Sequence, residues 1–164
     1  MDRNIEIVQA CPGDIETASS LMIDAAAWLK ERGQELWFSE ELAPERLKGA
    51  VDAGELHLVH MDGKPVGTAI FQLHDRIFWP DMPEGDAAYI HKLTMNREVA
   101  GRGLGIQVIA WARDRARQMG LTYLRLDTEA SRWKLCDYYE HAGFARHSER
   151  QVGRHYVVRY EMRV

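Results

Sequence analysis

The sequence is poor in features that mark several classes of protein. It has only two cysteines, Cys11 and Cys136, which lie far apart and in no metal-ligand spacing, so a disulfide framework is not expected. No apolar run approaches the roughly 18 residues that a membrane-spanning helix needs. The opening "MDRNIEIVQACPGD" lacks the apolar stretch of a secretory signal peptide. These absences favour a cytoplasmic protein that has no membrane partner.

Basic charge is not in surplus either. The 164 residues carry 21 Lys and Arg against 25 Asp and Glu, a formal net charge of −4. General nucleic-acid-binding proteins usually carry a basic surplus, so nucleic acid is not an expected partner. Hydrophobic residues make up 46% of the chain, and there is no internal repeat or linker. We therefore expect one globular domain over residues 1–164.

Hydrophobic periodicity predicts the elements of the first half. Residues 4–9 alternate apolar and polar, which predicts a strand, and residues 15–33 show the spacing of an amphipathic helix. A second, shorter helix is expected within residues 39–53. Two strand-like runs then flank Asp62-Gly63, a dipeptide typical of a type I′ hairpin turn.

The second half alternates strands and helices. "AAYIHKLTM" (87–95) predicts a strand, residues 104–119 a helix, and "LTYLRLD" (121–127) another strand. This order implies parallel strands joined by a right-handed crossover. A helix near residues 131–142 and a C-terminal strand pair follow. The expected fold class is α+β, with a mixed sheet that is antiparallel early and parallel in the middle.

The turn between the strand at 87–95 and the next helix is rich in glycine. "AGRGLG" (100–105) delivers the chain into a helix N-terminus, where backbone N–H groups and the helix dipole favour an anion, typically a phosphate. Glycine has no side chain that could block the close approach of a phosphate to the backbone. Arg102 lies inside the turn and can add a charged contact.

Two common phosphate-binding motifs fit this turn poorly. A Walker A loop needs Lys followed by Ser or Thr after its glycines, and that pair is absent. The dinucleotide fingerprint G-x-G-x-x-G needs glycine where Ile106 stands, and the strand before it carries His91 and Lys92. Asp127, at the end of the next strand, keeps a nicotinamide-dependent oxidoreductase open as an alternative.

The third candidate ligand is the pyrophosphate of coenzyme A. The turn resembles the signature [Q/R]-x-x-G-x-[G/A] of the GNAT superfamily of acyl-CoA-dependent N-acetyltransferases, with Gly103 and Gly105 at the glycine positions and Ala100 where Gln or Arg is usual. "YIHKLTM" is similar to the family's strand before this loop, and "CDYYEHAGF" (136–144) to its late "LYEKLGF" signature. The resemblance covers nearly the whole chain. It implies a mostly antiparallel twisted sheet of about six to seven strands, about four flanking helices and a parallel pair at the turn.

The resemblance also implies an activity. The donor would be acetyl-CoA with no metal, and a primary amine of a small-molecule or peptide acceptor would attack it directly in a ternary complex. The alternative is a non-catalytic acyl-CoA-binding module that regulates a partner. The backbone of residues 93–95 would pair with the pantetheine arm. Arg132 stands where relatives often carry asparagine, so it either meets a phosphate or points to solvent. The implied donor-binding residues are Leu93, Thr94, Met95, Val99, Ala100, Gly101, Arg102, Gly103, Leu104, Gly105 and Arg132.

Two residues are candidates for acid and base. Tyr139 takes the position of the family's general acid, and a tyrosine with its ordinary pKa of about 10 can protonate a leaving thiolate at neutral pH. Its alternative role is that of a core aromatic. His91 is the candidate base because imidazole titrates near neutral pH. Its alternative role is that of a structural histidine bonded to a backbone group.

The acceptor side is less defined. Acidic residues such as Asp75 offer negative charge to a cationic amine, or simply form a solvated face. Trp28 and Trp37 either belong to the core or wall the acceptor pocket, which the resemblance places near residues 33–38. The C-terminal strands are a plausible surface for a homodimer.

Overall fold

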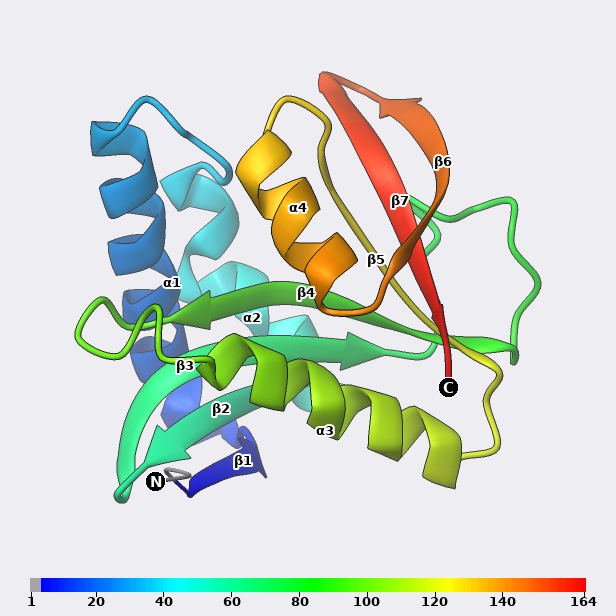
Figure 1. Cartoon of the computed structure of the whole chain (residues 1–164). Helices are drawn as coiled ribbons and strands as arrows, with labels where there is room; N and C mark the ends of the chain where they lie inside the picture. The colour runs from blue at the N-terminus through cyan, green and yellow to red at the C-terminus, as the bar shows by residue number, and fades with distance from the viewer. Residues whose placement is uncertain (1–3) are drawn as a thin grey trace. The chain divides into compact units, whose positions relative to one another are not determined.

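The structure is a computed structural model that describes residues 4–164. Within that range, hydrogen bonds link seven strands in the order β1-β2-β3-β4-β5-β7-β6 (Figure 1). The chain forms two compact units: one extends to Phe71 and resumes over Lys92–Val108, and the other comprises Gln72–His91 and Ile109–Val164. None of the helices in residues 4–164 combines the length and apolar character that a membrane span requires.

The first unit begins with a strand, two helices and a hairpin. Its elements are β1 (Ile5–Gln9), η1 (Pro12–Asp14), α1 (Ile15–Glu31), η2 (Ser39–Leu42), α2 (Pro44–Asp52), β2 (Leu56–Met61) and β3 (Lys64–Gln72). β2 pairs antiparallel with both β1 and β3, and α1 lies beside α2 (Figure 1). Asp62 and Gly63 have φ of 53° and 77°, as a type I′ turn requires. The first strand, the two helices and the type I′ hairpin expected from the sequence are therefore confirmed.

The core of this unit lies between the two helices and the hairpin. Ala18, Met22 and Ala26 recur on one face of α1 and are buried together with residues of α2, β2 and β3. Ser19 is the polar member of that face, and its hydroxyl donates to the carbonyl of Leu42 at 2.6 Å. This bond satisfies a buried hydroxyl and holds η2 against α1.

Strand β4 (Ala87–Met95) is fixed tightly against β3 in its last four residues. A Cβ added at Gly67 would lie 2.4 Å from the carbonyl oxygen of Thr94 and 2.7 Å from the sulfur of Met95, so only glycine fits there. The Thr68 hydroxyl donates to the carbonyl of Lys92 at 2.8 Å and lies 2.7 Å from the Thr94 hydroxyl. β3 thus sets the position of the stretch predicted to meet the donor.

The second unit contains the start of β4, most of α3 (Leu104–Gln118), β5 (Tyr123–Glu129), α4 (Trp133–His141), β6 (Ala145–Val152) and β7 (His155–Arg163). β4 and β5 are parallel, whereas β7 pairs antiparallel with β5 and with β6, beside which it runs in Figure 1. The mixed sheet and the parallel pair expected from the sequence are confirmed.

Two buried arginines fasten the loop between β3 and β4. Arg125 donates to Asp86 at 3.0 Å, and Arg159 donates to Asp81 at 2.6 Å and to the carbonyl of Phe78 at 3.1 Å. A buried guanidinium needs such partners because an unpaired charge is costly in the interior. The hydrogen bonds from Arg159 lower the pKa of Asp81 to about 2. The loop is thereby held on β5 and β7, which fixes the segment that contains Asp75.

Candidate functional site

The glycine turn lies between β4 and α3, in the first unit. The carbonyl of Asn96 accepts hydrogen bonds from the N–H groups of Val99 at 3.0 Å and Ala100 at 2.9 Å. The Val99 side chain is buried, and so is that of Leu104 at the start of α3. These residues anchor the two ends of the turn, so Val99 and Ala100 use their own N–H groups within it.

The middle of the turn is open. Gly101 and Gly103 have φ of 77° and 76°, a region that favours glycine, and a Cβ added at either residue would meet no atom within 4 Å. The first N–H groups of α3 have no partners within the helix. The turn therefore fits a phosphate: its backbone is accessible, no side chain covers the two glycines, and Gly105 lies in the first turn of α3.

The β4 stretch before the turn contains an irregular residue. Lys92 has φ of 49°, which a non-glycine residue seldom adopts within a strand. After it, Leu93 and Met95 are half-buried, while Thr94 is buried and its hydroxyl is engaged by Thr68. Of these three residues, Thr94 thus has only its backbone to offer a ligand.

Two tryptophans contact the glycine turn and the end of β4 in the same unit. The guanidinium of Arg97, in the turn, lies 3.4 Å from the ring centroid of Trp28 on α1. The Nζ atom of Lys92 lies 5.0 Å from the ring of Trp37, in the segment after α1. Cation–π contacts of this kind are attractive at such distances. Trp28 and Trp37 therefore connect α1 and its following segment to the turn and to Lys92 of β4.

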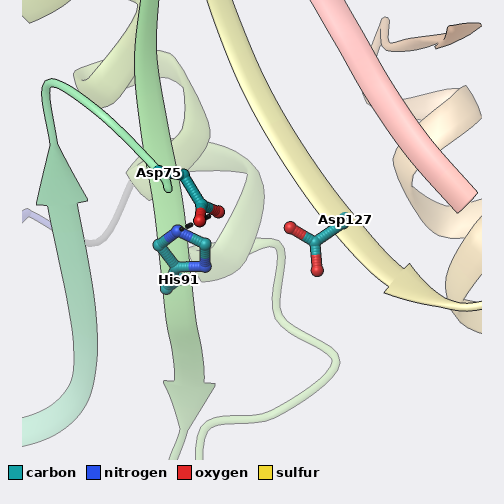
Figure 2. A group of neighbouring side chains, drawn as sticks. All are labelled: Asp75, His91 and Asp127. Atoms are coloured by element: carbon teal, nitrogen blue, oxygen red, sulfur yellow. Dashed lines mark ion pairs between the residues drawn. The ribbon is translucent and has the colours of Figure 1, made fainter. Parts of the chain in front are cut away.

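The second unit holds the predicted base. His91 Nε2 lies 3.1 Å from Oδ2 of Asp75 (Figure 2), and the other carboxylate oxygen accepts the N–H groups of Ile77 at 3.0 Å and Phe78 at 2.9 Å. Burial alone would raise the pKa of Asp75, but the hydrogen bond and charge of His91, together with the two N–H groups, outweigh burial and hold that pKa below its ordinary value. Asp75 is therefore a carboxylate that fixes one side of the imidazole.

A second carboxylate joins this pair. Asp75, His91 and Asp127 each offer one ligand-type atom, and these atoms lie within 4.8 Å of one another (Figure 2). From the sequence, Asp127 supported only the dinucleotide-binding alternative, and no pattern connected it with His91. The parallel register contains the missed signal: Tyr89 pairs with Arg125, and His91 and Asp127 each lie two residues beyond that last pair on their own strands.

The predicted acid lies in an aromatic cluster. The Tyr139 ring packs 5.4 Å from Tyr138, 6.1 Å from Phe144 and 6.3 Å from Tyr160, centroid to centroid. Burial, followed by the charges of Tyr138 and Asp127, raises its pKa well above the ordinary value. The phenol therefore stays protonated at neutral pH, and the ring is packed as a core aromatic.

Arg132 precedes α4 in the second unit. It is the N-cap residue of that helix and is half-buried, so it neither lies in the core nor extends freely. Its carbonyl accepts the N–H groups of Leu135 and Cys136 and starts the helix.

Three comparisons with known proteins agree with one another. The acetyltransferase (GNAT) family profile matches residues 22–144. The chain is 27% identical over 144 residues to the uncharacterized N-acetyltransferase YesJ of Bacillus subtilis, covering 82% of this chain and 80% of that protein. An acetyltransferase of the GNAT family from Listeria monocytogenes superposes with a TM-score of 0.81 at 24% identity, over 98% of this chain and 95% of that one. Aminoglycoside acetyltransferase AAC(6′)-Ib, in complex with coenzyme A and kanamycin, superposes with a TM-score of 0.74 at 18% identity, over 98% of this chain and 95% of that one.

Proposed function

The chain belongs to the acetyltransferase (GNAT) family, and we propose that it transfers the acetyl group of acetyl-CoA to a primary amine by direct attack in a ternary complex. Residues 1–164 would act as one acetyltransferase domain. The observation that carries this proposal is the open glycine turn before α3, where Gly101 and Gly103 leave the backbone uncovered inside the family match. A pyrophosphate is the group of the donor that such a turn suits.

Acetyl-CoA supplies an activated thioester, and residues of the chain would bind it and polarise its carbonyl. Gly101 to Gly105 would hold the pyrophosphate with backbone N–H groups, aided by the exposed Arg102. The backbone of residues 93–95 would pair with the pantetheine arm, and an N–H there would donate to the developing oxyanion. The departure at Ala100 removes one side-chain contact but leaves the backbone donors in place.

Two side chains would move protons. The acceptor enters as an ammonium ion and gives one proton to His91, which frees the lone pair that attacks the carbonyl carbon. The carbon–nitrogen bond forms, the carbon–sulfur bond breaks, and the electron pair stays on sulfur. Tyr139 would give its proton to that thiolate and be replenished from the acylated nitrogen, so that the products are an amide, free thiol and one released proton. Because burial raises the pKa of Tyr139, its phenol holds a proton at neutral pH before this step.

The acceptor is proposed to be a small-molecule amine. AAC(6′)-Ib, with its bound kanamycin, is one neighbour of this fold that takes such a ligand. We propose a cytoplasmic location, with neither nucleic acid nor membrane as partner, and a homodimer through the C-terminal strands remains part of this proposal.

The rival functions differ in what they would bind. A non-catalytic module would bind acetyl-CoA but release no thiol with any amine. The oxidoreductase alternative loses its support, because the sheet is mostly antiparallel and the family match is to acetyltransferases. It would bind NAD in preference to coenzyme A.

Thermal stability with acetyl-CoA, CoA or NAD tests the donor site. A ligand at 100 times its Kd stabilises the native state by about 2.7 kcal/mol, which raises the melting temperature measurably. We expect this rise with acetyl-CoA and CoA but not with NAD. Gly103→Val should abolish it, whereas Gly120→Val is the matched control, because both glycines have φ of 76° and open space around them. Equal shifts in the two variants would refute the phosphate role of the turn.

A further inference from the structure

We propose that Asp127, together with the His91–Asp75 pair, forms the subsite that binds the acceptor as an ammonium ion and thereby selects amines with no carboxylate beside the nitrogen. This inference rests on the proposed function and adds the acceptor class to it. It assigns three roles: Asp127 binds the ammonium, His91 takes its proton, and Asp75 positions His91.

The strands bring these residues together at the end of a ladder. In the described residues, the pairing of β4 with β5 ends at Tyr89 and Arg125, although both strands continue. His91 and Asp127 lie two residues beyond that last pair, and their side chains gather with Asp75 (Figure 2). Figure 2 shows the Asp127 carboxylate turned toward His91 and Asp75, beyond the point at which the two strands stop pairing.

The charge of the subsite matches an ammonium ion. Two carboxylates flank one imidazole, so the group is negative whenever His91 is neutral. A primary ammonium carries one positive charge and three N–H donors; the Asp127 carboxylate and the second ring nitrogen of His91 are acceptors of the right kind, while Asp75 is engaged by His91 and two backbone N–H groups. A carboxylate on the adjacent carbon would be brought close to two aspartates and repelled, so amino acids should be poor acceptors.

Arginines of the same unit are already engaged with other carboxylates. Arg159 lies opposite Asp127 in the register of β5 and β7, yet its guanidinium binds Asp81 through two hydrogen bonds of 2.6 and 3.1 Å. Arg125, two residues before Asp127, binds Asp86 and Glu161. These two buried cations are therefore committed to the carboxylates that fasten the loop and the end of β7.

The proton then has a defined route. The ammonium bound by Asp127 passes one proton to the imidazole of His91, and Asp75 stabilises the imidazolium that results. The neutral amine attacks the thioester, and the product is an amide without positive charge. Loss of that charge weakens its attraction to Asp127, which favours product release.

The test uses amines that differ only by the carboxylate: propylamine against 2-aminobutanoate, and 2-phenylethylamine against phenylalanine. Thiol release from acetyl-CoA by the wild-type protein should favour the member without the carboxylate at least tenfold in kcat/KM. Asp127→Asn should raise the KM for that amine at least tenfold while the KM for acetyl-CoA is unchanged. Glu129→Gln, the control on the same strand, should leave both unchanged because Glu129 is engaged by His155.

Asp75→Asn separates positioning from binding. This variant should lower kcat at least tenfold with little change in the KM for the amine or for acetyl-CoA, because the imidazole ring of His91 is still present but no longer fixed. Melting temperatures of all variants establish that they fold. A wild-type preference for the amino acids, an unchanged amine KM in D127N, or an equal rise in E129Q would overturn the inference. The proposed function would fail differently, with no stabilisation by acetyl-CoA and no thiol release from any amine.

Discussion

The guanidinium carbon of Arg97 lies 3.4 Å from the ring centroid of Trp28, so a cation of the glycine turn packs on an aromatic ring of α1. Arg32 contacts the same ring at 4.0 Å. Trp28 thus holds a residue of the turn in place, although it lies nearly 70 positions earlier in the chain.

Removing this ring should weaken donor binding. Trp28→Ala and Arg97→Ala should each raise the Kd for acetyl-CoA, because the turn loses a restraint that pre-organises it. The double variant should be less impaired than the sum of the two, with a coupling energy of about 0.5–1 kcal/mol, as for an exposed cation–π pair. Calorimetric titration of the four proteins measures this cycle, and strict additivity would show that the contact does not order the turn.

Gly67→Ala should destabilise the protein and impair donor binding. The new Cβ would lie 2.4 Å from the carbonyl oxygen of Thr94, so β3 or β4 must shift. Overpacking of this kind costs about 1–3 kcal/mol. Gly49→Ala is the control: it lies inside α2 with nothing within 4 Å, and it should stabilise the helix by up to about 1 kcal/mol. Urea denaturation compares them, and similar midpoints would contradict the close approach of β3 and β4.

Tyr139→Phe should lower kcat by a factor of about 10²–10⁴, the usual contribution of a general acid, with the KM for acetyl-CoA nearly unchanged. The ring still packs against Phe144 and Tyr160, so the fold should survive. Tyr138→Phe removes a neighbouring hydroxyl from the exposed side of the same helix and should leave kcat unaltered. If both variants turn over at the wild-type rate, Tyr139 is a core aromatic only.

Asp81 should make the free energy of unfolding depend on pH in the acid range. Hydrogen bonds from Arg159 lower its folded-state pKa from 3.8 to about 2, so the native state favours the carboxylate more than the unfolded state does. The resulting stability is present above pH 3.8 and is lost as the pH falls toward 2. Because the carboxylate is 44% exposed, solvent screens the effect and it should be modest. Urea midpoints measured over this range should fall less in Asp81→Asn than in the wild type; parallel curves would exclude Asp81 as the source.

Local patterns predicted most of the fold. The strand at 87–95, the helix after the glycine turn and the type I′ hairpin at Asp62-Gly63 appear as expected, because periodicity and turn residues act within a few positions. The glycine turn was also recognisable, since its chemistry resides in consecutive residues.

The grouping of side chains around His91 was not predictable in the same way. Asp75, His91 and Asp127 come from a loop and two strands, and no local spacing connects them. Their proximity depends on the parallel register of β4 with β5 and on the arginines that fasten the loop. Likewise, the burial of Tyr139 depends on Phe144 and Tyr160, which a helical pattern alone does not place around it.

The most direct test of the central claim is to follow acetyl-CoA and a panel of primary amines by mass spectrometry while free thiol is titrated. The account predicts N-acetylated amine and coenzyme A in equal amounts, with formation of both suppressed in Gly103→Val but not in Gly120→Val. Binding of acetyl-CoA with no acetylated product from any amine would contradict it and indicate a regulatory module instead.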